Sequence, residues 1–171
     1  AGKVRHVGVS NETPWGLHCY LQLAESGDRA RIASIQNPYS LLNRSFEVGL
    51  AEMSIREDVG LLAYSPLAFG VLSGKFLNGA MPPASRIARW QRFARYTNEQ
   101  GSRATESYAA VAVKHGLDMA QMSLAFVSQQ RFVSSVLIGA TTMEQLKINI
   151  GSKDVRLRDE VIDRKSTRLN S

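Results

Sequence analysis

The sequence predicts an α/β fold with a parallel sheet, and three observations predict it. Four short apolar runs alternate with segments of helical periodicity. Parallel neighbours need a connection of helix length, so this alternation favours right-handed strand–helix–strand units. The 171 residues, of which 44% are hydrophobic, are enough to bury the core of one ordinary domain.

The first strand and helix are expected at the amino end. VRHVGV at 4–9 has the pattern of a buried strand, and Thr13 with Pro14 supplies an N-cap and a first-turn proline. Gly27 is expected to end the helix. The inward face of this helix is predicted to carry Leu17, Leu21 and Ala24.

The middle of the chain predicts a second unit and a third strand. RIASIQ predicts a strand over about 31–36, and a helix is expected over about 46–57, where Gly60 can end the element. The third strand is predicted over about 61–65. The helix is expected to bury Phe46, Leu50 and Met53.

A long polar stretch, residues 74–103, separates these elements from the rest. It contains two prolines and is longer than a simple connection, so we expect it to be functional or mobile. The elements predicted after it are helices over about 104–115 and 120–130, a strand over 133–139 and a helix over 142–150.

The candidate site lies where the strands end. In parallel α/β sheets the carboxyl ends of the strands carry the chemistry, because they meet at one edge. The segments expected there hold most of the small and amide-bearing residues that could meet a ligand: GVSN at 8–11, QNPY at 36–39, YSPL at 64–67 and GATT at 139–142.

Four ordered motifs give a resemblance to a known family: GVSNE at 8–12, IQNPYSLLNRSFE at 35–47, AYSPLAFGVLSGK at 63–75 and LIGATTMEQLKIN at 137–149. Together they resemble the aldo-keto reductases, most closely the bacterial Tas-like branch. The resemblance runs from about residue 2 to about residue 163. Because all four motifs occur in the family's order and at its spacing, the resemblance is specific. One motif alone would be weak evidence for the family.

The resemblance implies a (β/α)8 barrel that reduces carbonyls with NADPH, of which residues 1–163 would be the C-terminal half, strands five to eight. A complete barrel takes about 250 residues, more than the 171 present. In the family the catalytic aspartate, tyrosine, lysine and histidine come from the first four strands. None of those motifs is present, so no catalytic residue is assigned.

The resemblance also implies a nicotinamide site. Ser10, Asn11 and Gln36 match the residues that hydrogen-bond the carboxamide, where short polar side chains suit a planar amide. Tyr64 matches the aromatic residue that stacks on the nicotinamide ring. Without the resemblance, a tyrosine of the core would be an equally good interpretation of Tyr64.

The strand end at 65–75 resembles the family loop that wraps the pyrophosphate. Its glycines let the backbone approach the phosphates, and its lysine adds charge. An ordinary turn with a surface lysine is the alternative. The residues predicted to bind cofactor are Ser65, Pro66, Leu67, Ala68, Phe69, Gly70, Val71, Leu72, Ser73, Gly74 and Lys75.

Arg86 resembles the arginine that related branches place on the 2′-phosphate of NADPH, where a planar guanidinium suits a bidentate contact. From the residues alone, a solvated arginine is the better interpretation. The adenosine end is implied to meet Gly139, Ala140, Thr141, Gln145 and Asn149. Many family members carry charged residues at the positions of Gly139 and Gln145, so the NADPH preference depends here on Arg86. Ile148 stands where an adenine-binding glutamate is frequent.

Other reactive groups are expected to be structural. The single cysteine, Cys19, excludes an intrachain disulfide and favours a reducing, cytoplasmic setting, and no Cys/His spacing suggests a metal site. The three histidines lie far apart in sequence, and Glu57 and Asp58 would point in different directions. No apolar run is long enough for a membrane helix.

The net charge of +6 is unevenly distributed. Half of it lies in the polar tail 164–171, which we expect to be foreign to the domain. The arginines at 86, 89, 92 and 95 alternate with aromatic residues, a pattern that a solvated helix or a phosphate-binding loop explains better than nucleic acid does.

Three functions stay open from the sequence. The first is the cofactor-binding half of an NADPH-dependent reductase of aldehydes or ketones, inactive alone and needing the missing N-terminal half. The second is a non-catalytic NADPH-binding regulatory subunit, and the third is a basic nucleic-acid-binding module. Half a barrel leaves a sheet edge unpaired, so self-association is expected.

Overall fold

The computed structural model describes residues 2–27, 29–158 and 161. It contains a four-stranded sheet in which sequential strands are neighbours and every pair is parallel. The parallel α/β architecture predicted from the sequence is therefore confirmed. The strands are β1 (Val7–Ser10), β2 (Ile32–Pro38), β3 (Gly60–Tyr64) and β4 (Val133–Val136). The proposed tail at 164–171 lies outside the described residues.

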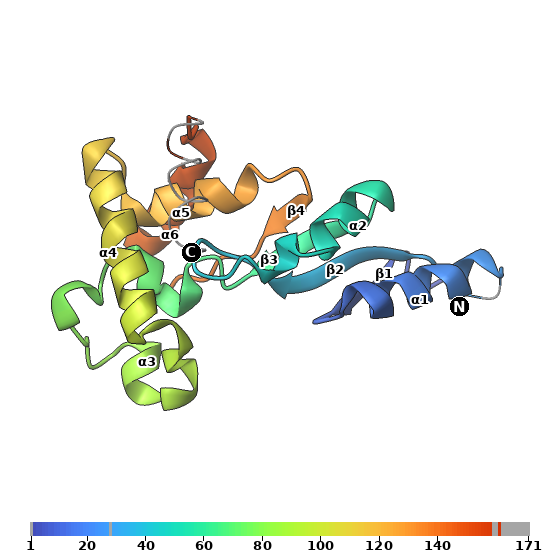
Figure 1. The fold of residues 1–171 in the computed structure, drawn as a ribbon, viewed down its shortest axis with the longest axis horizontal. Coiled ribbons are helices and arrows are strands. Elements are labelled where there is room, and N and C mark those ends of the chain that lie inside the picture. The colour runs from blue at the N-terminus through green and yellow to red at the C-terminus, as the bar shows by residue number, and fades with distance from the viewer. Residues whose placement is uncertain (1, 28, 159–160, 162–171) are drawn as a thin grey trace.

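Six α-helices are assigned in the described part of the chain: α1 (Pro14–Glu25), α2 (Leu50–Arg56), α3 (Arg86–Arg89), α4 (Glu99–Lys114), α5 (Met119–Ser128) and α6 (Met143–Gly151). Short 3₁₀ turns occupy Ser45–Glu47, Ala68–Ser73, Leu77–Gly79, Gln91–Tyr96 and Ser152–Asp154. Figure 1 shows α3 and α4 at one end of an elongated molecule and α1 at the other. No described helix combines the length and hydrophobicity needed to cross a bilayer.

Helix α1 forms as its sequence predicts. The Thr13 hydroxyl accepts a hydrogen bond from the N–H of Gly16 at 3.1 Å. Pro14 lies in the first turn, where backbone N–H groups have no acceptor within the helix, so the proline costs no helical hydrogen bond. Leu17 and Leu21 are buried on the face toward the core. Gly27, just past the end of the helix, adopts a φ of +92°.

The predicted bounds of several elements were wrong. The helix expected over 46–57 is broken at Gly49, whose φ of +84° takes the chain out of a right-handed helix, so that a 3₁₀ turn precedes α2. The first strand begins at Val7, because β2 pairs with it only from Ile32. The last strand ends at Val136 rather than at 139.

The stretch 74–103 is more regular than a long loop. Its three short helical segments bury Ile87 and Tyr96 in the core. Helix α4 starts at Glu99, earlier than predicted, because Asn98 caps it by accepting the N–H of Gly101 at 2.8 Å. This stretch is therefore a packed layer of the fold.

The two faces of the sheet differ in composition. Ile35, Leu61 and Ala63 are completely buried on one face. On the other face the strand register aligns Ser10, Gln36, Leu62 and Ser135 in one row across all four strands, and none of these is buried. One face is thus the hydrophobic core, and the second is more polar and more open.

Candidate functional site

The carboxyl ends of the first three strands form a continuous edge. Ser10 is paired with Gln36 across β1 and β2, and Pro38 is paired with Tyr64 across β2 and β3. Because the strands are parallel, the three loops that follow them leave the sheet on the same side. The sheet register therefore brings the predicted residues Ser10, Gln36 and Tyr64 to one edge.

Asn11 is fixed at this edge by the neighbouring strand and by Tyr64. Its backbone N–H donates to the carbonyl of Gln36 at 3.0 Å, and its Oδ1 accepts the hydroxyl of Tyr64 at 2.8 Å. The Ser10 hydroxyl donates to the same Gln36 carbonyl at 2.9 Å. Asn11 adopts a left-handed φ of +56°, a conformation that asparagine tolerates better than most residues. Its amide nitrogen takes no part in these bonds and can donate to a ligand.

Asn37, which lies in the predicted edge segment 36–39 but was not named as a site residue, supports the same edge. The residue is 8% exposed, and its Nδ2 donates to the carbonyl of Glu12 at 3.2 Å. Its Oδ1 is buried without a partner among the described residues. This amide connects β2 to the turn between β1 and α1, and its place beside Gln36 at a strand end was the available signal.

The chain turns sharply after β3. Ser65, Ala68 and Phe69 adopt left-handed φ values of 52°, 48° and 58°, and Gly70 follows at 92°. Left-handed conformations of residues other than glycine cost about 1 kcal/mol or more each, and they cluster at functional sites. The turn is closed by the Ala68 N–H, which donates to the Ser65 carbonyl at 2.9 Å.

The apolar members of this loop serve the core. Its buried residues are Pro66, Ala68, Val71 and Leu72. Their side chains are not available to a ligand, so any contact they make there would have to come from the backbone. The structure thus separates the predicted loop 65–75 into an inner apolar half and an outer half with Ser73 and Lys75, which are exposed.

Lys75 folds back over Gly70. A Cβ atom placed at Gly70 would lie 2.7 Å from the Lys75 Nζ, so this close approach depends on glycine. Lys75 is exposed as a residue, but desolvation of its ammonium group against the loop, with the nearby positive charge of Arg86, lowers its pKa. Among the described residues neither cation forms an ion pair. Two neighbouring cations without a carboxylate partner favour an anionic ligand.

The arginines that follow are packed against aromatic rings of the same region. The guanidinium carbons of Arg86 and Arg92 lie 5.4 and 4.9 Å from the centre of the Phe93 ring, and that of Arg95 lies 5.7 Å from Phe69. Phe69 and Phe93 contact each other at 4.9 Å between ring centres. These two rings are therefore covered by the chain itself, which weakens the interpretation as a base-stacking surface.

The fourth loop is held by amides of α6. The Gln145 Oε1 accepts both the N–H and the hydroxyl of Thr141, at 2.9 and 3.0 Å, and the Asn149 Nδ2 donates to the carbonyl of Gly139 at 3.3 Å. Asn149 is buried, whereas Ala140 and Thr141 are exposed. Gln145 and Asn149 thus shape the loop, and the exposed surface comes from residues 139–141.

The predicted residues form three local groups in the structure. One is the bonded set of Ser10, Asn11, Gln36 and Tyr64, the second contains Gly70, Lys75 and Arg86, and the third is the loop held by Gln145 and Asn149. No described contact joins the three groups directly. A ligand that touched all of them would have to be long.

Comparisons with known proteins agree with one family. The model of the aldo/keto reductase family matches residues 1–166. The protein tas of Escherichia coli K12 is 58% identical over 162 residues, which cover 95% of this chain and 47% of that protein. An aldo-keto reductase of Babesia bovis is 37% identical over 87% of this chain and 54% of its own length. The L-glyceraldehyde 3-phosphate reductase of Escherichia coli K12 is 33% identical over 88% of this chain and 44% of its own length. The chain thus spans about half the length of the curated relatives it matches.

Proposed function

The chain belongs to the aldo/keto reductase family, and we propose that it is the cofactor-binding half of a reductase that uses NADPH to reduce aldehydes or ketones. In this proposal residues 1–163 supply strands five to eight of a (β/α)8 barrel. The remaining strands, with the groups that act on the carbonyl, come from an N-terminal half.

Several surfaces support a missing half. The sheet has four strands, where such a barrel has eight, and β1 and β4 are its two edges. Helix α1 exposes 73% of Trp15 and 55% of Leu23, which with Cys19 line an apolar groove along the helix. An apolar surface of this kind on a helix is typical of an interface. We propose that an upstream helix packs there and an upstream strand pairs with β1.

The residues at the strand ends fit a nicotinamide ring. Its carboxamide offers one acceptor and two donors in a plane, and the amides of Asn11 and Gln36 can complement them. The bond from Tyr64 to Asn11, 2.8 Å long, orients this amide and holds the tyrosine ring at the same edge. A ring fixed in this way can stack on a flat heterocycle with little further loss of side-chain conformational entropy.

The second and third groups fit the phosphates and the adenosine. Lys75 and Arg86 form a cationic pair, and Gly70 allows Lys75 to approach the backbone. We propose that this pair receives the charge of the phosphates and that Arg86 contacts the 2′-phosphate. The loop at 139–141, shaped by Gln145 and Asn149, would receive the adenosine.

The chemistry is divided between the two halves in this proposal. NADPH, when bound, supplies a hydride to the carbonyl carbon. The residues of this chain bind the cofactor, hold its nicotinamide in one orientation and keep its phosphates in place. A general acid near the carbonyl oxygen must come from the other half, so the chain alone is expected to bind NADPH without turning over a substrate.

The bonded set around Asn11 is the observation that carries the proposal. We expect calorimetric titration of the 171-residue chain with NADPH to show one site, weaker for NADH because Arg86 contacts the 2′-phosphate. A chain that binds neither would refute the proposal. Binding of DNA or RNA without competition by NADPH would favour the nucleic-acid function. A complete barrel that binds NADPH but reduces no carbonyl would favour a regulatory subunit.

A further inference from the structure

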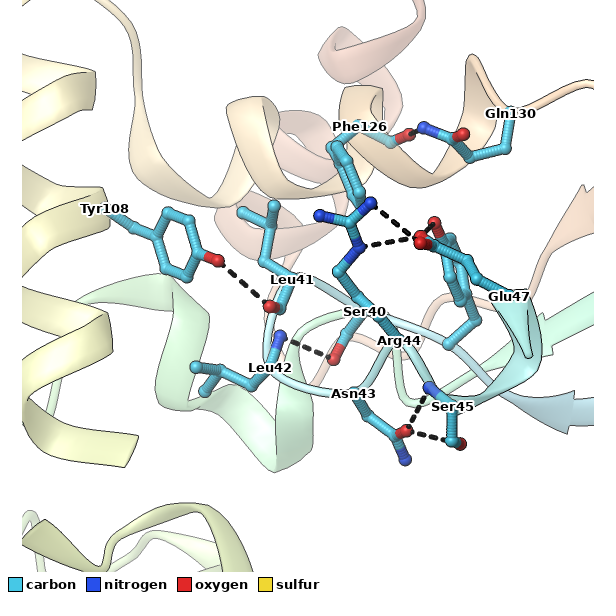
Figure 2. Close-up of polar contacts among 11 residues, drawn as sticks. Ser40, Leu41, Leu42, Asn43, Arg44, Ser45, Glu47, Tyr108, Phe126 and Gln130 are labelled. Atoms are coloured by element: carbon cyan, nitrogen blue, oxygen red, sulfur yellow. Dashed lines mark hydrogen bonds and ion pairs between the residues drawn. The ribbon is translucent and has the colours of Figure 1, made fainter. Parts of the chain in front are cut away.

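The loop at 39–47, which follows β2, contains a half-buried chain of polar side chains that the proposed cofactor contacts do not use. The Tyr39 hydroxyl donates to the Glu47 Oε1 at 2.6 Å. Arg44 donates to both carboxylate oxygens of Glu47, at 2.7 and 2.8 Å, in a bidentate pair. Figure 2 shows Arg44 reaching across the loop to Glu47 beneath α5.

Aromatic side chains enclose this network. The completely buried ring of Tyr39 lies 5.2 Å from Phe132 in an edge-on contact and 5.9 Å from Phe126 in a stacked one. The Arg44 guanidinium lies 5.5 Å from the centre of the Phe126 ring. Burial, followed by the hydrogen bond to Glu47, raises the pKa of Tyr39 far above its usual range. The phenol therefore stays a neutral donor to a carboxylate that Arg44 also neutralises.

The network reaches the candidate site through a single backbone bond. The N–H of Tyr39 donates to the carbonyl of Tyr64 at 3.3 Å, and the hydroxyl of Tyr64 donates to Asn11. A shift of Tyr39 therefore moves the residue proposed to lie against the nicotinamide ring. Among the described residues, no hydrogen bond leads from this network to Lys75 or to the loop at 139–141.

The other contacts of the loop do not bear on Tyr64. The Tyr108 hydroxyl donates to the carbonyl of Leu41 at 3.1 Å, and the Asn43 Nδ2 donates to the Tyr96 hydroxyl at 3.2 Å. In Figure 2, Tyr108 extends from α4 toward Leu41, and no hydrogen bond among the described residues joins it to Arg44 or Glu47. These contacts hold the loop to the helical layer, so they provide a control for its general stability.

We propose that Tyr39, Arg44 and Glu47 are positioning residues for the nicotinamide end of the cofactor, acting through Tyr64. This inference rests on the proposed function and deepens it. A network that only stabilised the fold would affect every ligand alike. A positioning network affects ligands that contain nicotinamide and leaves those that lack it unchanged.

The test compares two fragments of the cofactor on the full 171-residue chain. Reduced nicotinamide mononucleotide carries only the nicotinamide end, and adenosine 2′,5′-bisphosphate carries only the adenosine end. Tyr39→Phe keeps the packed ring and removes its donor. We expect it to weaken binding of the mononucleotide about 5- to 10-fold, the effect of one lost hydrogen bond, and to change the bisphosphate affinity less than about twofold.

Matched variants distinguish an effect on the orientation of Tyr64 from an effect on the stability of the fold. Tyr108→Phe also removes one buried phenol hydroxyl that bonds to the same loop, and it should lower the melting temperature without discriminating between the fragments. Glu47→Ala should repeat the pattern of Tyr39→Phe. Glu47→Gln, which keeps an acceptor for Tyr39, should restore part of the mononucleotide affinity. The two Glu47 variants decide the question if Tyr39→Phe does not fold.

Each result has a separate meaning. A loss of affinity for the mononucleotide alone supports the positioning role. An equal loss of affinity for both fragments, or no loss for either, overturns that role while the proposed function stands. If the unmodified chain binds neither fragment nor NADPH, the proposed function fails, and the positioning role fails with it.

Discussion

The hydroxyl of Tyr64 donates to the side-chain oxygen of Asn11 at 2.8 Å, although 53 residues separate them in the chain. Their strands are not neighbours, because β2 lies between β1 and β3. The bond therefore spans the middle strand at its carboxyl end. Together with the bonds to the Gln36 carbonyl, it joins the carboxyl ends of β1, β2 and β3 into one surface.

Removing the hydroxyl of Tyr64 should loosen Asn11. We expect Tyr64→Phe to weaken NADPH binding about 3- to 10-fold, because the side-chain amide of Asn11 loses its hydrogen bond to Tyr64 while the ring remains. Calorimetric titration measures this change. Tyr20→Phe, the same chemical change on the exposed side of α1, is the control. Equal affinities in both variants would mean that the bond does not serve cofactor binding.

A side chain at Gly70 should displace Lys75. The Cβ of Gly70→Ala would lie 2.7 Å from the Lys75 Nζ, at a residue whose φ is +92°. We expect about tenfold weaker binding of adenosine 2′,5′-bisphosphate, the loss of one charged contact. Gly79→Ala is the matched control, because its φ is +74° but its Cβ meets nothing within 4 Å. Similar losses in both variants would assign the effect to backbone strain alone.

Phosphate binding should depend on pH through Lys75. Partial burial and Arg86 lower the pKa of this ammonium, so it loses its charge at a lower pH than an ordinary lysine does. The affinity for adenosine 2′,5′-bisphosphate should therefore fall as pH rises toward 10. Lys75→Arg, which stays charged, should flatten that decline. A decline of the same steepness in both proteins would exclude Lys75 as its cause.

Alkaline stability should depend on Tyr108. Burial raises the pKa of this phenol from 10.0 to about 12. The folded state thus holds the proton more tightly than the unfolded state. This shift contributes on the order of 2 to 3 kcal/mol to the free energy of unfolding. The contribution is fully present below pH 10 and is lost as pH rises toward 12. Burial also raises the pKa of Tyr39, so this residue too contributes stability that is lost at alkaline pH.

Denaturant unfolding between pH 8 and 12 measures this dependence. Tyr108→Phe should be less stable at neutral pH by about 1 kcal/mol, since it leaves the Leu41 carbonyl without its donor. Its stability should fall less steeply above pH 10 than that of the unmodified chain. Tyr20→Phe should leave the profile unchanged. An unaltered slope in Tyr108→Phe would disprove the assignment.

Local signals predicted the fold where they were sufficient. Thr13 and Pro14 define the start of α1 through contacts within one turn, and the alternation of strands and helices led directly to the parallel sheet. The break at Gly49 was missed, because an apolar helical pattern continues across it and only the backbone conformation reveals the interruption. The start of α4 was missed because the cap at Asn98 lies outside the apolar pattern.

The sequence named candidate residues, whose role in binding stays a prediction, and it did not name the contacts that join them. The motifs named Asn11 and Tyr64, whereas the bond between them depends on strand order. The network of Tyr39, Arg44 and Glu47 was missed because a charged pair three residues apart is usually a solvated surface pair. Its burial comes from Phe126 and Phe132, which lie far away in sequence. Such contacts become visible only once the chain is folded.

The most direct test of the proposed function is the rate of NADPH oxidation with an aromatic aldehyde. The chain would be assayed alone and joined to the upstream half of the Escherichia coli protein tas, with the separate upstream half as control. We predict turnover by the joined protein only, and a loss of that turnover in its Asn11→Ala variant. Robust turnover by the 171-residue chain alone would contradict the proposal that it supplies only the cofactor-binding half.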